Sequence, residues 1–388
     1  MAYYGIRKTL YMNVVSLFAN IGIGEAYLES LGFSVVVANE LEPKRADIYR
    51  QIYPNTEMIC GDITDTKVYS SIVKAASKHK IDVLMATPPC QGMSTAGKQD
   101  KYDPRNGLFL HAVDLIKDLK PDYFIFENVP GFMTTSIIYN DEPRLIPDIL
   151  KDLLKTTYTM SFNIVDTQDF GVPQSRTRMI LLGTRRKAAR KWEMPEKDTK
   201  INTLEDAIGH LPIVDPYIYD ISEEEMHKFF PKYKEREEAA LKISPWHIPP
   251  RHILRQVITM QHTPTGCSAF DNEIYKPRKK NGEIVKGFHN TYSRQRWDTP
   301  AYTIAMSNNQ ISTQNSVHPG RLIGKDANGD DIYSDPRVFT IYELMRIMSI
   351  PDDWAIPTTV SKQYLRHIIG EGVPSLLISK LFSQIKNG

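Results

Sequence analysis

The stretch Phe18-Ala19-Asn20-Ile21-Gly22-Ile23-Gly24 places two glycines in a turn directly after an apolar run. That run, residues 12–18, predicts a short strand, and residues 25–31 predict a helix that ends at Gly32. A strand, a glycine-bearing turn and a helix form the first unit of a doubly wound α/β domain, in which ligands bind beyond the carboxyl ends of the strands. We therefore expect an α/β protein with a mostly parallel sheet. The turn itself either binds a ligand or serves only the fold.

Acidic residues follow the next two predicted strands. Glu40 comes just after the strand predicted over residues 34–38, and Asp62 follows the one over residues 57–60. At these positions Glu40 is suited to bind ribose hydroxyls and Asp62 to accept from an adenine amino group, with Ile63 covering the ring. The alternatives are a helix N-terminal charge for Glu40 and a turn or helix cap for Asp62. Because no glycine-rich phosphate loop is present, the suggested adenosine need not carry phosphates.

A cysteine follows the fourth apolar run, residues 81–86, in the sequence Thr87-Pro88-Pro89-Cys90-Gln91-Gly92. Two prolines remove two N–H donors and fix the backbone, so neither a strand nor a helix can continue through them. Cys90 is thus presented by a stiff turn at the end of a strand. It is either a small packed residue or a nucleophile.

Charged residues also follow a strand predicted over residues 122–126. Glu127 leaves this apolar run, where a dry environment would raise its pKa and suit a carboxyl group that must donate a proton. The alternative is a capping or salt-bridged acid. Further on, alternation in a strand predicts that Gln174, Arg176 and Arg178 share one face. Buried arginines need acceptors, for which Glu127, a base carbonyl and a phosphate are candidates, whereas a surface pair needs none.

The bulk composition limits the class of protein. The chain has 388 residues, enough for two domains, and a formal net charge of +2, so any nucleic-acid binding must rely on local basic patches. Three cysteines without a CxxC pair or a Cys/His cluster predict no metal site and fit a reducing compartment. Neither a signal peptide nor a membrane-spanning apolar run is evident, and we expect a cytoplasmic protein without a membrane partner.

Taken in order, these segments resemble the DNA (cytosine-5) methyltransferase family of bacterial restriction–modification systems. The resemblance rests on an ordered set that covers nearly the whole chain: Phe18-x-x-x-Gly22, Glu40, Asp62-Ile63, Pro89-Cys90-Gln91, Glu127-Asn128-Val129, Gln174-x-Arg176-x-Arg178, residues 297–304, His318-Pro319, residues 340–354 and residues 370–374. Two features depart from the family. Asn20 and Ile23 stand where it often has glycine, and Glu371 stands where it usually has asparagine.

The resemblance implies a fold, a cofactor and a set of roles. The fold is that of S-adenosylmethionine-dependent methyltransferases, and the cofactor is S-adenosyl-L-methionine. Cys90 would attack C6 of a flipped-out cytosine, Glu127 would contact N3 and the amino group, Arg178 would face the base O2, and Arg176 would support them. The implied cofactor-binding residues are Phe18, Asn20, Ile21, Gly22, Glu40, Leu41, Asp62, Ile63, Pro89, Leu108, Glu371 and Val373. The implied DNA-binding residues are Ser94, Lys98, Arg105 and Gln174.

The remaining segments divide the chain. We predict a catalytic and cofactor-binding domain over residues 1–185, completed by residues 361–388, and a smaller DNA-recognition domain over residues 186–360. Helices are predicted over residues 143–155 and 375–385, the last returning to the first domain, and a capping box at Thr340 to Glu343 predicts another helix start. The expected partner is double-stranded DNA, bound by a monomer, with a possible cognate endonuclease that acts on the same site without forming a stable complex.

Four other functions fit the sequence motifs less well. A tRNA cytosine-5 methyltransferase would share the motifs, but a recognition segment of this length favours DNA. A non-catalytic DNA-binding relative is disfavoured because Cys90, Glu127, Arg176 and Arg178 occur together. An oxidoreductase would share the fold class but would need a three-glycine pyrophosphate turn. Methylation of an exocyclic amine would predict an aromatic residue where Cys90 follows Pro89.

Overall fold

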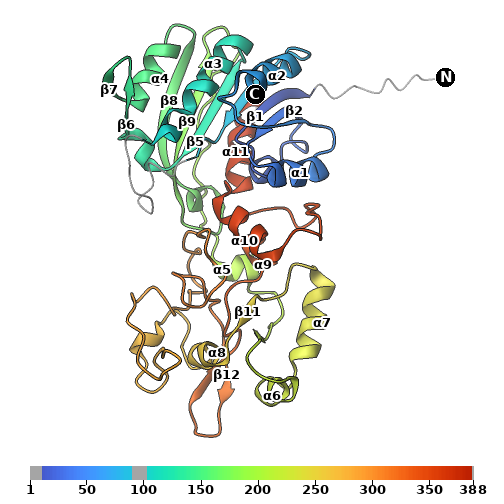
Figure 1. Ribbon diagram of the computed structural model, residues 1–388, viewed down its shortest axis with the longest axis vertical. Coiled ribbons are helices and arrows are strands. Elements are labelled where there is room, and N and C mark those ends of the chain that lie inside the picture. Colours follow the sequence, from blue (N-terminus) through green and yellow to red (C-terminus); the bar gives the residue numbers. More distant parts are fainter. Residues whose placement is uncertain (1–10, 90–102, 387–388) are drawn as a thin grey trace, which may run out of the picture.

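The computed structural model describes residues 11–89 and 103–386 of the chain. It has two lobes, one built on a large sheet and the other made of short helices, loops and hairpins (Figure 1). The first lobe contains the N-terminal half of the chain and its last helix. The second lobe contains most of residues 186–360.

One seven-stranded sheet organises the first lobe, with the strand order β3-β2-β1-β4-β5-β9-β8. The strands β1 to β5 run parallel, whereas β9 is antiparallel to both β5 and β8. This confirms the predicted doubly wound, mostly parallel sheet. The strands span Met12–Leu17 (β1), Phe33–Glu40 (β2), Glu57–Cys60 (β3), Val83–Ala86 (β4), Tyr123–Asn128 (β5), Tyr158–Asp166 (β8) and Thr177–Arg185 (β9).

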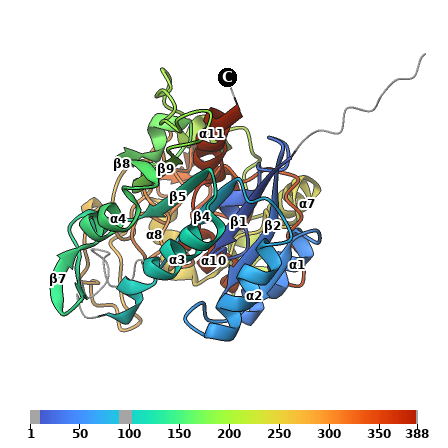
Figure 2. The same ribbon diagram turned by 90° about the horizontal axis from the view of Figure 1, so that it is seen from above.

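Helices cover both faces of this sheet (Figure 2). On one face, buried residues of α2, α3 and α4 share a core with alternate residues of β1, β4 and β5. On the other face, α11 packs against the intervening residues of the same strands, and α1 covers β2 through Ala46 and Tyr49. The helices span Pro43–Ile52 (α1), Thr66–Ala76 (α2), Phe109–Leu119 (α3), Ile146–Leu154 (α4) and Ser375–Lys386 (α11).

The predicted first helix, residues 25–31, is wrong. Only a short 3-10 turn, Ile23–Glu25, follows β1, and the next residues form turns up to β2. The face that this helix would cover is taken by α11, whose Ser375 hydroxyl donates to the Ile23 carbonyl at 2.6 Å. The predicted return of the last helix to the first lobe is therefore confirmed, and it explains why a local helix is not needed.

The predicted helix over residues 143–155 begins later than expected, at Ile146. Its first residues instead form β7 (Glu142–Leu145), which pairs with β6 (Ser136–Tyr139) in an antiparallel hairpin. Asn140 and Asp141 connect the two strands with φ values of 53° and 64°. Asn and Asp tolerate this left-handed conformation, which two-residue hairpin turns require.

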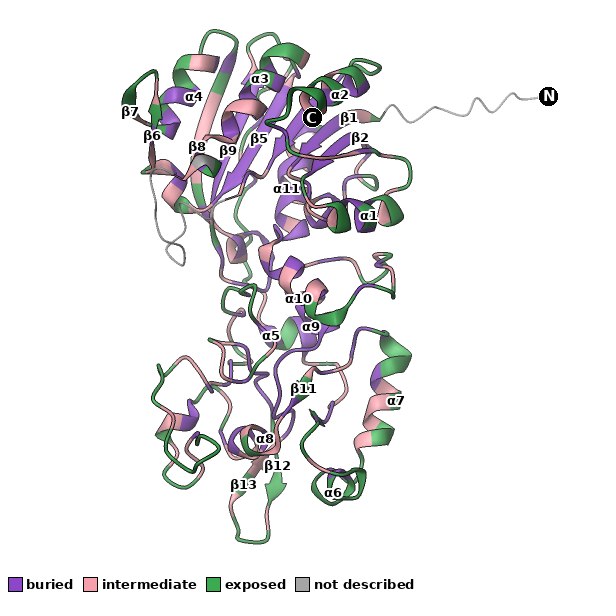
Figure 3. Ribbon diagram, viewed as in Figure 1, coloured by how far each residue is buried: buried purple, intermediate pink, exposed green. Residues whose placement is uncertain are grey.

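The second lobe contains short elements with a small core of its own, built from residues such as Val257, Met260 and Val317. The inner strands β1, β4, β5 and β9 are buried along most of their length, whereas the outer strands β3 and β8 are mostly half-buried and much of the second lobe's periphery is exposed (Figure 3). Its elements are α5 (Leu204–Ile208), β10 (Tyr217–Ile218), α6 (Glu223–Phe229), α7 (Tyr233–Ile243), β11 (Arg251–His252), α8 (Leu254–Gln261), β12 (Leu322–Lys325) and β13 (Asp331–Tyr333).

The junction between the lobes is itself packed. Helices α9 (Ile341–Ile347) and α10 (Lys362–Glu371) share a hydrophobic core with α5 and with Ile21 and Ile23 of the glycine turn. The predicted capping box at the start of α9 is confirmed, since Thr340 and Glu343 bond each other's backbone N–H. None of the helices among the described residues is long and apolar enough to cross a membrane.

Candidate active site and cofactor site

The predicted site residues that the structure describes gather at one edge of the sheet, where β1, β2, β4 and β5 end. Phe18 follows β1, Glu40 ends β2, Pro88 and Pro89 follow β4, and Glu127 lies near the end of β5. Parallel pairing of these strands brings their carboxyl ends to the same edge. Cys90, Ser94 and Lys98 lie outside the described residues, so Pro89 is the last described position before the predicted nucleophile.

Asn128 fixes the segment that leads to Cys90. Its side-chain amide donates to the Pro88 carbonyl at 2.9 Å, and its side-chain oxygen accepts from the Val129 N–H at 2.9 Å. On the other side, the Thr87 hydroxyl donates to the Phe18 carbonyl at 3.1 Å. Because Pro88 has no N–H to pair in the sheet, these side-chain bonds replace ladder bonds beyond β4. Asn128 belongs to the motif Glu127-Asn128-Val129, but the sequence indicated no role for it. Its position directly after Glu127 could have indicated that it lies at the site.

Glu127 and Arg178 form an ion pair at the end of β5, with 2.9 Å between Glu127 Oε1 and Arg178 Nε. Both side chains are largely withdrawn from solvent, with exposed fractions of 9% and 13%. Burial raises the pKa of Glu127, and the charges of Arg178 and Arg176 oppose that rise. The predicted dry carboxyl and the salt-bridged alternative therefore coexist: the group is buried, and a cation adjoins it.

The prediction that Gln174, Arg176 and Arg178 share one face of a strand is wrong. Both precede β9, and both are buried, with exposed fractions of 0% and 3%. The alternation rule applies only within a strand, and β9 begins at Thr177.

These two side chains instead bind segments that cross between the lobes. The Gln174 amide donates to Met348 Sδ at 3.1 Å and accepts from the Ile304 N–H at 3.1 Å. Arg176 donates to the carbonyls of Ile304 and Gly370, at 3.2 and 3.1 Å. This placement favours a role for Gln174 in joining the lobes over the DNA contact predicted for it.

The glycine turn after β1 is held by Glu40. The Glu40 carboxylate accepts from the Asn20 N–H at 2.9 Å and from the Glu42 N–H at 3.0 Å. The turn contains three positive φ angles, 59° at Phe18, 52° at Asn20 and 82° at Gly22. Asparagine tolerates this region better than most residues, so Asn20 adopts the conformation that the family's glycine would supply. At Gly22 a Cβ would lie 2.2 Å from the Tyr53 ring, so only glycine fits there.

The other predicted cofactor residues differ in their exposure to solvent. Ile21, Ile63 and Val373 are buried, and Phe18, Pro89, Leu108 and Glu371 are half-buried, whereas Leu41 and Asp62 are exposed. Asp62 accepts from the Thr64 N–H at 2.9 Å, which is the turn alternative; its predicted adenine contact stays a prediction.

These residues fit S-adenosyl-L-methionine. Apolar side chains are available for the adenine ring, and a strand-end carboxylate is available for the ribose hydroxyls. Arg105 is exposed and paired with Asp103, at 2.8 Å from Arg105 Nε to Oδ1, so its predicted phosphate contact also stays a prediction.

Sequence reasoning missed a buried polar network beneath the turn. Glu25, only 2% exposed, accepts hydrogen bonds from the Ser16 hydroxyl at 2.5 Å and from the Tyr49 hydroxyl. Burial raises the pKa of Glu25 to about 7. Beside it, the Tyr53 hydroxyl donates to the Gly22 carbonyl at 2.7 Å and accepts from the Trp354 indole N–H at 3.0 Å. No sequence signal placed Glu25 inside, since glutamate in a predicted helix is ordinarily exposed.

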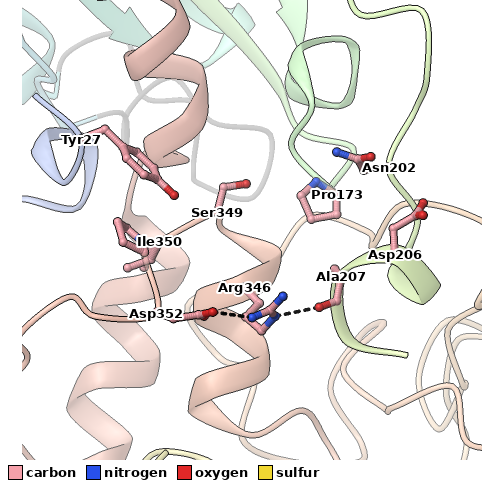
Figure 4. Close-up of a pocket in the computed structure, with 10 residues that line it drawn as sticks. Tyr27, Pro173, Asn202, Asp206, Ala207, Arg346, Ser349, Ile350 and Asp352 are labelled. Carbon is pink, nitrogen blue, oxygen red and sulfur yellow. Dashed lines mark hydrogen bonds and ion pairs between the residues drawn. The ribbon is translucent and has the colours of Figure 1, made fainter. Parts of the chain in front are cut away.

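A cavity of about 280 Å³ lies at the junction of the lobes (Figure 4). Tyr27, Pro173 and residues of α5 and α9 line it, and no predicted site residue does. Within it, Arg346 pairs with Asp352 at 2.7 Å and donates to the Ala207 carbonyl at 2.7 Å. Since its charged group is already paired, we assign this cavity to the packing between the lobes.

The solved structures that this chain resembles include methyltransferases. The chain resembles Spodoptera frugiperda DNMT2 with a TM-score of 0.59 and 17% identity, covering 97% of this chain and 100% of that one. It resembles the Entamoeba histolytica methyltransferase EhMeth with a TM-score of 0.59 and 16% identity, covering 97% and 98%. At these identities the likeness establishes the fold, which is that of S-adenosylmethionine-dependent methyltransferases.

The family follows from the sequence comparison. The model of the C-5 cytosine-specific DNA methylase family matches residues 12–387, and the chain belongs to this family. It is 40% identical to the Type II methyltransferase M1.HgaI of Avibacterium volantium, over 96% of this chain and 98% of that protein. It is 28% identical to the Type II methyltransferase M.DdeI of Desulfomicrobium norvegicum, over 96% and 88%. The predicted activity, methylation of cytosine C5 in DNA with S-adenosyl-L-methionine as methyl donor, is therefore confirmed.

Proposed function

We propose that Cys90 is the nucleophile of this DNA cytosine-5 methyltransferase and that Glu127 and Arg178 hold the target base. The Cys90 thiolate bonds to C6 of a flipped-out cytosine, which turns C5 into a carbon nucleophile. S-adenosyl-L-methionine supplies an electrophilic methyl group, which C5 accepts. Loss of the C5 proton and release of the thiolate then restore the aromatic ring. Glu127 contacts N3 and the amino group, and Arg178 contacts O2.

The observation that carries this proposal is the paired anchoring at the ends of β4 and β5. Asn128 binds the Pro88 carbonyl, two residues before Cys90, and the neighbouring Glu127 is paired with Arg178. A nucleophile and a base-binding carboxyl must be held within fractions of an ångström of each other's working positions. One strand end that holds both Glu127 and the Pro88 carbonyl supports the assignment of Glu127 and Cys90 to one site.

We propose that the substrate is one cytosine in a short double-stranded DNA sequence, read by residues 186–360. The Type II methyltransferase relatives support a restriction–modification role in the bacterial cytoplasm. There the modified site would be protected from a separate endonuclease that forms no stable complex with this monomer. The basic segment at residues 276–280 supplies charges for DNA phosphates. The basic residues 185–187 and 190–191 lie at the opposite end of the sheet, where Thr184 pairs with Tyr123, and they do not face the site.

Trapping on modified DNA tests the proposed chemistry. A fluorine at C5 cannot leave as a proton does, so DNA carrying 5-fluorocytosine in the target site should become covalently attached to the wild-type protein in the presence of methyl donor. The Cys90→Ser variant should neither be trapped nor transfer tritiated methyl groups, while still binding S-adenosylhomocysteine.

The matched control is Cys267→Ser, which removes an exposed thiol and should leave trapping and transfer intact. Duplex DNA and tRNA are assayed in parallel, and preference for tRNA would contradict the proposed substrate. Substantial methyl transfer by Cys90→Ser would overturn the proposed nucleophile.

A further inference from the structure

The segment that leaves α10 packs directly on the glycine turn. Gly372 follows α10, and a Cβ on it would lie 2.7 Å from Ile23 Cδ1, so the Ile23 side chain occupies the space beside this glycine. Ser375 then donates to the Ile23 carbonyl. Glu371, the last residue of α10, directly precedes Gly372, so its carboxylate lies next in the chain to the contact with the glycine turn. That carboxylate is half-buried, with 19% of the side chain exposed.

Arg45, in the first turn of α1, neutralises this carboxylate. Its Nη2 lies 2.7 Å from Glu371 Oε2, and its Nε lies 2.9 Å from Glu42 Oε2. The Arg45 side chain is 17% exposed, so these charges are only partly screened by water. The Arg45 charge also acts on Glu40, where it opposes the burial that raises the Glu40 pKa. The positive charge of Arg45 thus acts on the carboxylates of Glu371, Glu42 and Glu40, and Glu40 is the one that binds the glycine turn.

A second contact ties the same two helices. The Tyr364 hydroxyl of α10 donates to Glu42 Oε1 at 2.5 Å, and the Lys44 ammonium lies 3.9 Å from the centre of the Tyr364 ring. His367 Nε2 lies 3.3 Å from Glu371 Oε1. The pair of His367 and Glu371 lies within α10. The contacts of Tyr364 with Glu42 and Lys44 are the ones that hold the start of α1 against α10.

We propose that Arg45 is a positioning residue for the cofactor site. By neutralising Glu371, it holds Glu40 and the segment after α10, residues 372–375, in the arrangement that binds S-adenosyl-L-methionine. The inference rests on the proposed cofactor site. Without the guanidinium, the Glu371 carboxylate would keep its charge in a partly dry place beside Glu40 and Glu42. Like-charge repulsion would then move α10 and the segment after it away from the turn.

Charge removal on either side of the pair tests this role. We expect Arg45→Gln to raise the KM for S-adenosyl-L-methionine, and the Kd for S-adenosylhomocysteine measured by titration calorimetry, roughly tenfold, with kcat changed less than about twofold. Adding Glu371→Gln removes the uncompensated anion. The double variant should therefore recover part of the lost affinity and bind the cofactor about threefold or more tightly than Arg45→Gln. A merely additive loss of contacts would make the double variant worse than Arg45→Gln.

The control is Lys78→Gln, which breaks an exposed pair with Glu57 in the same lobe and should change neither constant. Unchanged binding by Arg45→Gln, or a double variant no better than the single one, would overturn the inference. Failure of both variants to fold would also overturn it, because neutralising Glu371 should restore the fold. If the wild-type protein itself did not bind S-adenosylhomocysteine, the proposed cofactor site would fail instead.

Discussion

Replacing Glu25 with glutamine should make the protein more stable at alkaline pH. Burial raises the pKa of this carboxyl from 4.5 to about 7 in the folded protein. A raised folded-state pKa means that the neutral form is favoured in the fold, so the contribution to stability is fully present below pH 4.5 and is lost as the pH rises through 7. The difference of pKa corresponds to about 3 kcal/mol.

Glutamine is uncharged and can accept one of the two hydrogen bonds through its carbonyl oxygen while its amide N–H donates to the other hydroxyl, as the protonated carboxyl does. We therefore expect wild type and Glu25→Gln to have similar free energies of unfolding near pH 4.5, and the variant to be about 3 kcal/mol more stable at pH 8. Urea unfolding of both proteins across this range measures the difference. Burial also lowers the pKa of His318 to about 4. Such groups titrate in both proteins, so their contributions cancel in the difference between the two free energies of unfolding.

The exposed neighbour Glu29 supplies the control. Glu29→Gln changes an exposed surface side chain and should alter the free energy of unfolding by no more than about 0.5 kcal/mol. A flat difference for Glu25→Gln, or one in which wild type gains stability relative to the variant as the pH rises, would show that Glu25 is not a buried, proton-binding carboxyl.

Three further substitutions follow from the contacts at the site. Asn128→Ala removes the bond to the Pro88 carbonyl and should lower kcat about tenfold or more with little change in the KM for methyl donor, measured by tritiated-methyl transfer. Tyr53→Phe releases the Gly22 carbonyl and should raise that KM a few-fold at unchanged kcat. Arg176→Gln leaves two buried carbonyls unpaired and should lower the free energy of unfolding by about 2–4 kcal/mol, measured in urea. Wild-type values in any of these assays would contradict the corresponding contact.

The sequence predicted the sheet and the edge at which the site lies because apolar runs mark buried strands and strand ends carry the polar groups. Glu40 and Glu127 were placed at the correct edge on this basis alone. The helix over residues 25–31 failed because its face is covered from the far end of the chain and because Glu25 turns inward to Ser16 and Tyr49. The periodicity of neighbouring residues cannot identify partners so far away in the sequence.

The predicted grouping of Gln174 with the two arginines failed for a different reason. Alternation describes residues inside a strand, and β9 starts only at Thr177, so Gln174 and Arg176 follow the irregular backbone before it. Their partners, Ile304, Met348 and Gly370, lie more than a hundred residues away, where no local pattern could identify them. Most helices and strands of the second lobe are too short for their periodicity to be seen, and its longest helix, α7, buries only Ala240 and so lacks a clear apolar face.

The seating of α11 against the first turn has a consequence for biosynthesis. Ser375 and Ile23 are 352 positions apart, yet their contact closes one face of the sheet. During translation, the apolar side of β1 therefore stays exposed to solvent until α11 has been synthesised. The cofactor-binding half of the nascent chain cannot complete its core before then, because contacts of such high sequence separation form late.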